Sequence, residues 1–258
     1  MPRPRILERF LRCRRKASAD PPAFPGRFHP PAILRRRLIR RVANGFAVPE
    51  PKRITIRTDR DVYEPAEDTE LLIRSVRLHE GDRVLEIGTG TGVVAIHCAR
   101  LGCRVTATDI QASAVELARE NADANAVELE LLHGDMFEPV RGVYDVVILN
   151  PPYLPTAPED LTHSALDRAL DGGPDGTAVA LRFIEGVPRH LARGGHAYMV
   201  VSSLQDLARI RHAVHDRGLA ARVVGTDKFD LEAISVLEIR RPPKRTASAR
   251  VPPPKKHR

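Results

Sequence analysis

Short apolar runs alternate with longer amphipathic segments through the middle of the chain. The apolar runs predict strands at 83–87, 104–108, 128–132, 144–149 and 196–201. In the segments between and after them, apolar residues recur at helical spacing, which predicts helices at 92–101, 112–125, 177–191 and 203–217. This alternation predicts an α/β fold, with a doubly wound, mostly parallel sheet covered by helices on both faces.

The pattern changes after Gly218, where helical spacing gives way to two strand-like runs at 221–224 and 232–239. A short polar segment separates them, so they predict a C-terminal antiparallel hairpin that extends one edge of the sheet. The chain has 258 residues, enough for one α/β domain of this kind. It contains no apolar run of the roughly 18 residues that a membrane-spanning helix needs, so we expect no membrane association.

Positive charge is concentrated at the two ends of the chain. Residues 1–50 contain 13 Lys and Arg against 3 Asp and Glu, residues 241–258 contain 7 against none, and residues 51–240 contain 21 against 30. The two ends also hold 13 of the 22 prolines, which cannot join helices or central strands. We therefore expect a folded acidic domain at 51–240 between two mostly disordered basic extensions, with one short amphipathic helix at 33–43.

Cysteine and histidine positions indicate neither a disulfide framework nor a metal site. The three cysteines are odd in number and include no Cys-x-x-Cys pair, and His97, His133 and His163 lack metal-ligand spacing. Cys98 and Cys103 are interpreted as core residues. The first 15 residues also lack the apolar stretch of a secretory signal, so we expect a cytoplasmic protein.

Three glycines follow the first predicted strand, in the sequence Glu-Ile-Gly-Thr-Gly-Thr-Gly (86–92). Glycine permits a sharp strand-to-helix turn and a close approach of the backbone to a ligand. The spacing differs from the Gly-x-Gly-x-x-Gly of dinucleotide sites and suits a nucleotide-like cofactor without a pyrophosphate. The candidate cofactor-binding residues are therefore Glu86, Gly88, Gly90 and Gly92; the alternative is an ordinary strand-to-helix turn.

Two further acids follow the second and third predicted strands. Asp109 comes 21 residues after Gly88, where a carboxylate can accept hydrogen bonds from both hydroxyls of a ribose. Asp135 could receive an exocyclic adenine amine, with Met136 packed on the face of the ring. Each acid alone would be typical of a turn, but together with the glycine turn they predict a pocket for S-adenosylmethionine at the carboxyl edge of the sheet.

The sequence Asn-Pro-Pro-Tyr follows the fourth predicted strand at 150–153. Pro151 and Pro152 fix φ and remove two amide donors, so the loop presents carbonyl oxygens beside the amide oxygen of Asn150. Two such acceptors can hold both N–H bonds of a planar NH₂ group and orient its lone pair toward a methyl donor, while Tyr153 flanks the group. Asn150, Pro151, Pro152 and Tyr153 are therefore the candidate catalytic residues.

Four segments together resemble one known family: DVYEPAEDTELL (61–72), EIGTGTG (86–92), NPPYLP (150–155) and ALDGGPDG (169–176). They are similar to the release-factor glutamine methyltransferases of the HemK/PrmC superfamily, of the archaeal and eukaryotic type. The resemblance implies that residues 150–154 hold a substrate glutamine, and that S-adenosylmethionine contacts Thr69, Glu86, Gly88, Asp109, Asp135, Met136 and Asn150. It further implies a translation termination factor with a Gly-Gly-Gln loop as substrate, and a small zinc-binding activator subunit as partner.

The segment at 61–72 also has a physical interpretation. Pro65 could begin a helix whose first turn presents Glu67, Asp68 and Thr69 near the cofactor. The alternative is that the two acids merely favour a helix N-terminus.

Two other functions remain open. An adenine-N6 methyltransferase acting on rRNA, tRNA or DNA would share the NPPY motif and use the basic ends, although the acidic domain weighs against a docked duplex. A non-catalytic tether to RNA or the ribosome is the third reading, and the intact NPPY motif argues against it.

Overall fold

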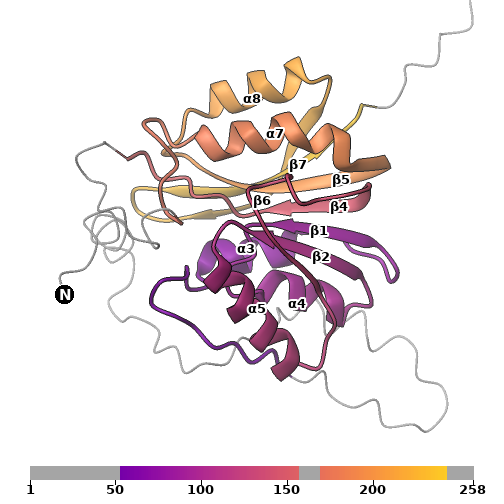
Figure 1. Cartoon of the computed structure of the whole chain (residues 1–258). Coiled ribbons are helices and arrows are strands. Elements are labelled where there is room, and N and C mark those ends of the chain that lie inside the picture. The colour runs from indigo at the N-terminus through magenta and orange to yellow at the C-terminus, as the bar shows by residue number, and fades with distance from the viewer. Residues whose placement is uncertain (1–52, 157–168, 243–258) are drawn as a thin grey trace, which may run out of the picture.

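The computed structural model describes residues 53–156 and 169–242 (Figure 1). The predictions for the extension at 1–50 and its helix at 33–43 concern residues outside these ranges, as do those for the tail after Pro242. None of the helices within the described ranges is long and apolar enough to cross a membrane.

One seven-stranded sheet organises the described residues. Its order is β3-β2-β1-β4-β5-β7-β6, with the first five strands parallel and β7 antiparallel to both β5 and β6. The strands are β1 (Arg83–Ile87), β2 (Arg104–Asp109), β3 (Glu130–His133), β4 (Tyr144–Leu149), β5 (Leu191–Ser202), β6 (Ala220–Lys228) and β7 (Ala233–Arg240). The predicted parallel sheet with a C-terminal antiparallel hairpin is confirmed.

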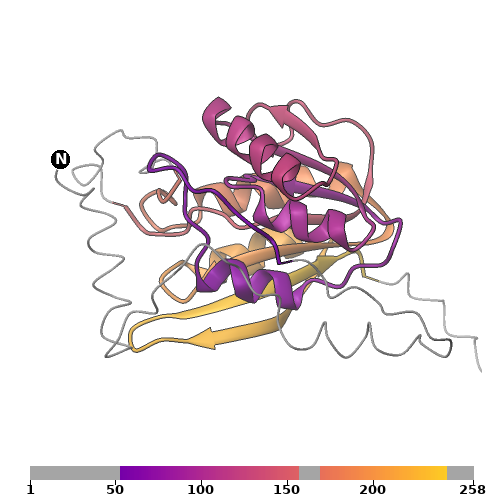
Figure 2. The same cartoon turned by 90° about the horizontal axis from the view of Figure 1, so that it is seen from below.

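Helices cover both faces of the sheet, as predicted (Figure 1). One face carries α3 (Glu67–Ser75), α4 (Val93–Arg100) and α5 (Ala112–Ala124), and the other carries α7 (Ala178–His190) and α8 (Leu207–Asp216). Figure 2 looks onto the face that carries α3, α4 and α5, where α3 packs against β5, β6 and β7, α4 packs against β1 and β2, and α5 packs against β2 and β3.

The alternation of side chains along β4 supplies both hydrophobic cores. Val146 and Ile148 pack into the core beneath α3 and α4, while Val147 and Leu149 pack into the core beneath α7 and α8. A strand that is buried on both faces must be apolar at consecutive positions, which explains why β4 reads as a continuous apolar run.

Three predicted boundaries differ from the structure because long-range pairing sets them. β3 spans 130–133 instead of the predicted 128–132, because its register is set by pairing with β2. β5 begins at Leu191, five residues before the predicted start, where it pairs with Tyr144 before an irregularity in the register. β6 continues past the predicted end at Val224, because a bulge between Val223 and Gly225 lets its pairing with β7 resume.

The start of α8 is set locally. Asp206 caps this helix by accepting a hydrogen bond from the backbone N–H of Arg209 (3.0 Å). The predicted start at Ser203 is therefore four residues too early, since the preceding residues form a turn in which the backbone N–H of Ser202 donates to Oε1 of Gln205 (2.8 Å).

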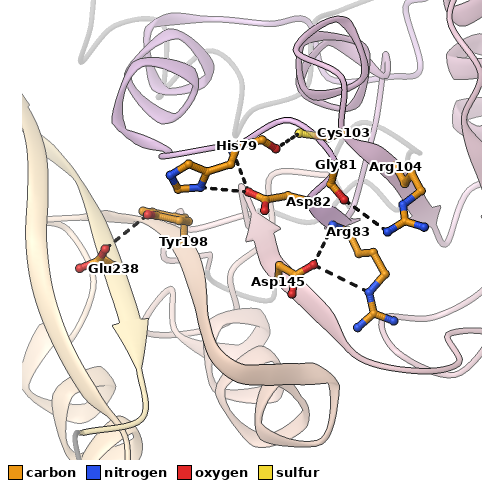
Figure 3. A network of polar contacts seen from close by, with 9 residues as sticks. All are labelled: His79, Gly81, Asp82, Arg83, Cys103, Arg104, Asp145, Tyr198 and Glu238. Atoms are coloured by element: carbon orange, nitrogen blue, oxygen red, sulfur yellow. Dashed lines mark hydrogen bonds and ion pairs between the residues drawn. The ribbon is translucent and has the colours of Figure 1, made fainter.

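Polar contacts tie together the amino ends of the parallel strands (Figure 3). The backbone N–H of Arg83, at the start of β1, donates to Oδ2 of Asp145 on β4 (2.9 Å). Just before β1, the backbone N–H of His79 donates to Oδ2 of Asp82 (2.7 Å), and Sγ of Cys103 approaches the carbonyl oxygen of His79 (3.5 Å). These contacts align β1, β2 and β4 at the edge opposite the glycine turn.

Two asparagines, one in α5 and one at its C-cap, fasten the extended segment that precedes α3. The side chain of Asn121 accepts from the backbone N–H of Arg57 (2.8 Å) and donates to its carbonyl oxygen (3.0 Å), and Asn125 pairs in the same way with Thr55. Asn121 is fully buried and also donates to the carbonyl oxygen of Thr91 in the glycine turn (2.9 Å). One side chain thus joins the N-terminal segment, α5 and the glycine turn.

We expect Asn121→Ala to lower the free energy of unfolding by about 2–3 kcal/mol, because it leaves buried donors and acceptors without partners. Urea denaturation should show a lower midpoint with an unchanged m-value. Asp123→Ala, an exposed change on the same helix, is the matched control and should stay within about 0.5 kcal/mol of the parent. Equal stability of the Asn121 variant and the control would contradict this role.

Candidate active site

A cavity of about 290 Å³ opens where the carboxyl ends of β1, β2 and β4 meet. The chain turns to opposite sides of β1 at this point, since β2 lies on one side and β4 on the other. Such a switch point is the usual ligand site of an open parallel sheet. The predicted site residues that line the cavity are Thr69, Glu86, Gly88, Gly90, Asp109, Asp135, Met136, Asn150, Pro151, Pro152 and Tyr153.

Glycines in the turn at 88–92, here called the glycine turn, serve either the cavity or the packing of helices. Gly88 has a φ of +68°, and an added Cβ would meet nothing within 4 Å, so its backbone faces open space at the cavity. Gly92 was also predicted to contact the cofactor, but the structure does not place it in the cavity lining. An added Cβ on Gly92 would lie 3.0 Å from Cβ of Ala118, so this glycine allows α4 to pack closely on α5.

Glu86 is buried beneath the glycine turn. Its Oε2 accepts hydrogen bonds from the Thr89 hydroxyl (2.7 Å) and from the backbone N–H of Ala95 in α4 (3.1 Å). Burial raises the pKa of the Glu86 carboxyl to about 8, although these two hydrogen bonds act in the opposite direction. Glu86 therefore fixes the shape of the turn as well as lining the cavity.

Asp109 connects the end of β2 to the same turn. Its Oδ2 accepts from the backbone N–H of Gly90 and its Oδ1 from that of Gln111, both at 2.9 Å. Burial raises the pKa of this carboxyl, and the two backbone hydrogen bonds oppose the rise. Each carboxylate oxygen can accept a further hydrogen bond, which fits the predicted role of Asp109 toward ribose hydroxyls.

Asp135 and Met136 form another part of the cavity wall. Oδ2 of Asp135 accepts from the guanidinium of Arg182 (2.7 Å), which also lines the cavity. Met136 has a φ of +51°, and its carbonyl oxygen accepts from the Thr108 hydroxyl (3.3 Å). Arg182 could not be predicted from the sequence, because a single arginine on an amphipathic helix carries no local signal of a partner 47 residues away.

The loop at 150–156, here called the acceptor loop, contains an unsatisfied acceptor. Oδ1 of Asn150 is buried and accepts no hydrogen bond from any residue within the described ranges. Buried amide oxygens nearly always have a partner, so this atom is suited to a ligand donor. The loop is held by the predicted ALDGGPDG segment: the backbone N–H of Gly172 donates to the Leu154 carbonyl, and that of Thr156 donates to the Gly173 carbonyl, each at 3.0 Å.

The YEPAEDT segment meets the acceptor loop at Asp68. The hydroxyls of Tyr153 and Tyr63 both donate to Oδ2 of Asp68, each at 3.0 Å. Asp68 and Tyr153 are buried, and all three residues line the cavity. The sequence placed Asp68 near the cofactor, and it gave no indication of this link to Tyr153 or of a role for Tyr63.

Among the histidines and cysteines considered as metal ligands, His97, Cys98 and Cys103 are buried in the core, whereas His133 is exposed. Within residues 53–156 and 169–242, no group of three or more His, Cys, Asp and Glu side chains could hold a metal ion. Burial lowers the pKa of His97 to about 4 and raises the pKa of the Cys103 thiol to about 11. Cys98 is buried as well, which agrees with its interpretation as a core residue, while His163 lies outside the described residues.

The raised pKa of Glu86 predicts a pH dependence of stability in the cofactor-free protein. Between the unfolded value near 4.5 and the folded value of about 8, the folded state holds a proton that the unfolded state releases. The contribution of this group to stability is therefore fully present below pH 4.5 and is lost as the pH rises toward 8, by up to about 1.4 kcal/mol per pH unit.

Glu86→Gln keeps the acceptor oxygen and removes the titration. Denaturation of the parent and the variant between pH 4.5 and 8 should therefore show a stability difference that shifts in favour of the variant as the pH rises. Glu128→Gln, an exposed change, is the control. A difference that does not vary with pH would contradict a proton on Glu86.

Comparison with known proteins agrees with this arrangement. Residues 54–229 match the family model described as methyltransferase small domain. A relative from Methanocaldococcus jannaschii, provisionally named a protein N5-glutamine methyltransferase, is 37% identical over 71% of this chain and 94% of its own length. The release factor glutamine methyltransferase of Moorella thermoacetica is 35% identical over 65% of each chain.

A solved structure has a similar fold. The E. cuniculi Mtq2–Trm112 complex, described as responsible for methylation of the eRF1 translation termination factor, contains a chain with a TM-score of 0.57 and 26% identity. The match covers 70% of this chain and 99% of that one. The chain therefore belongs to the methyltransferase small-domain family and is an S-adenosylmethionine-dependent methyltransferase.

Proposed function

We propose that this enzyme methylates the side-chain amide nitrogen of a glutamine in a protein, the glutamine of the Gly-Gly-Gln loop in a class I translation termination factor. The observation that carries the proposal is the buried Oδ1 of Asn150, which accepts no hydrogen bond within the described residues and lines the cavity. The names of the relatives from M. jannaschii and M. thermoacetica, both glutamine methyltransferases, support the same acceptor.

The acceptor loop suits the chemical problem that a carboxamide presents. An amide nitrogen is a poor nucleophile, because its lone pair is delocalised into the carbonyl group. If Oδ1 of Asn150 and the carbonyl oxygen of Pro151 each accept one N–H, the nitrogen is held with its lone pair directed along the line of methyl transfer. Pro151 and Pro152 keep the loop rigid, so little ordering remains to be done when the substrate binds.

The other side of the cavity suits the cofactor, which supplies an electrophilic methyl group on a sulfonium. Asp109 is in position to accept from ribose hydroxyls, and Asp135 to accept from the adenine amine beside Met136. Gly88 and Gly90 leave room for the ligand, while Glu86 and Thr69 complete the wall. Two of the acids already accept backbone hydrogen bonds, which fixes their orientation before the cofactor arrives.

Methylation of adenine N6 in a nucleic acid is the second candidate, because an adenine amine would meet the same two acceptors. Residues 51–240 contain 21 Lys and Arg against 30 Asp and Glu, and this excess of acids opposes the docking of a polyanion. The protein acceptor is therefore favoured.

We also propose a small activator subunit as partner, by analogy with the complex of Mtq2 and Trm112. In the described residues, β3 and β6 are the outer strands of the sheet, and each has one edge to which no other strand is paired. An added strand could pair there. We further propose that this subunit binds a zinc ion. The basic ends of the chain would tether the enzyme to the ribosome or to RNA.

The cofactor assignment predicts the effect of Asp109→Asn. The change keeps the size of the side chain and removes its charge, so the affinity for S-adenosylmethionine should fall by about 2 kcal/mol, or roughly 30-fold. Isothermal titration calorimetry measures this, with Asp123→Asn on the surface of α5 as the matched control. An unchanged dissociation constant would refute the contact with the ribose.

The acceptor assignment predicts the outcome of a substrate exchange. Replacing the glutamine of the Gly-Gly-Gln loop by asparagine shortens the side chain by one methylene, which moves its amide about 1.5 Å away from the methyl donor. Misplacement on that scale can lower the rate about 100-fold. With labelled S-adenosylmethionine, the glutamine factor should be labelled and the asparagine factor should not, with or without ribonuclease. Label that enters nucleic acid and disappears with nuclease would overturn the protein acceptor.

Asn150→Ala should abolish transfer to the glutamine factor. Because the change removes an acceptor for the substrate amide, the loss of turnover should far exceed any loss of affinity for S-adenosylmethionine. Retained turnover would exclude Asn150 from the reaction.

A further inference from the structure

We infer that Asp68 is a positioning residue for the methyl acceptor, which it orients through the hydroxyl of Tyr153. The inference rests on the proposed function, since it assigns a role within the same site. Asp68 and Tyr153 are 85 residues apart in the sequence, yet the Tyr153 hydroxyl donates to Oδ2 of Asp68 at 3.0 Å. Both residues are buried, with 1% and 4% of their surface exposed.

Asp68 is itself held firmly. Its Oδ1 accepts from the backbone N–H of Thr69 (2.7 Å) and lies 3.3 Å from the Thr69 hydroxyl. Its Oδ2 accepts from the hydroxyls of both Tyr63 and Tyr153. Hydrogen bonds to an ionised carboxylate are stronger than those between neutral groups, so this carboxylate is a rigid anchor in the first turn of α3.

The anchor reaches Asn150 through a short, stiff connection. Only Pro151 and Pro152 separate Asn150 from Tyr153, and both have a fixed φ. On its other side the acceptor loop is held by backbone hydrogen bonds to Gly172 and Gly173. The hydrogen bond to Asp68 therefore helps to set where the ring of Tyr153, and with it the acceptor oxygens, lie relative to the cofactor.

An amide does not reproduce the hydrogen-bond pattern of the carboxylate at this position. Asp68 accepts from two tyrosine hydroxyls on one oxygen and from the Thr69 backbone on the other. The amide of an asparagine has one acceptor oxygen, so it must present NH₂ either to the hydroxyls or to the Thr69 N–H. Either the contact with Thr69 is lost or both tyrosine hydroxyls must accept where they now donate, while the size of the side chain is unchanged.

The test is a double-mutant cycle in turnover with Asp68→Asn and Tyr153→Phe. Each single variant should lower kcat on the glutamine factor about 10- to 100-fold, as expected for a misplaced acceptor, while the dissociation constant of S-adenosylmethionine stays within about threefold. The double variant should be no slower than the slower single variant, because both changes break the same link. Glu70→Gln, an exposed change on the same helix, is the matched control and should leave kcat unchanged.

Two results would overturn the inference. Effects on kcat that multiply in the double variant would show that Asp68 and Tyr153 act independently. A weakened cofactor affinity with an unchanged kcat would assign Asp68 to the cofactor. If Asp68→Asn does not fold, Tyr153→Phe alone decides: it removes one hydroxyl, and an unchanged kcat would refute the link.

Failure of the proposed function can be distinguished from failure of this inference. If wild-type enzyme labels a nucleic acid instead of the termination factor, the acceptor assignment fails. The same cycle measured on that nucleic acid still tests Asp68, because either acceptor uses Asn150 and Pro151.

Discussion

Buried carboxylates hold together the loops at the carboxyl edge of the sheet. A chain that leaves a strand or begins a helix has backbone N–H groups that neither the sheet nor the helix pairs, and such groups need partners once they are buried. Glu86 accepts from Ala95, Asp109 accepts from Gly90 and Gln111, and Asp68 accepts from Thr69. The cavity has a defined shape because these side chains bind N–H groups that follow β1 and β2 or lie in the first turns of α3 and α4.

Burying these carboxyl groups has an energetic cost in the cofactor-free site. Burial raises the pKa of both Glu86 and Asp109, since their charged forms lose water that the protein replaces only in part. A cationic cofactor beside these acids would offset that loss, so the features that weaken the empty site favour the bound state. Concentration of perturbed carboxyls in one cavity is typical of functional sites rather than of structural ion pairs on a surface.

Local patterns were sufficient for the parts of the structure that depend on neighbouring residues. β1 and β4 begin and end where their apolar runs predict, and the glycine turn and the acceptor loop lie at the predicted strand ends. The start of β5 at Leu191 could not be predicted, because it depends on pairing with Tyr144 across the sheet. The same holds for the contacts of Asp68 with Tyr153 and of Arg182 with Asp135, whose partners are far apart in sequence.

If Asn150 and Pro151 hold the acceptor as proposed, the identity of the acceptor is decided outside the reacting atoms. A glutamine amide and an adenine amine each present a planar NH₂ with a delocalised lone pair, so two fixed acceptor oxygens orient either one equally well. Selectivity then depends on what carries the NH₂ group to the cavity. A nucleic acid brings phosphates toward a domain whose residues 51–240 have nine more acids than bases, whereas a protein loop can bring neutral or basic neighbours. On the proposed roles of Asn150 and Pro151, long-range charge rather than the shape of the acceptor loop would separate the two substrates.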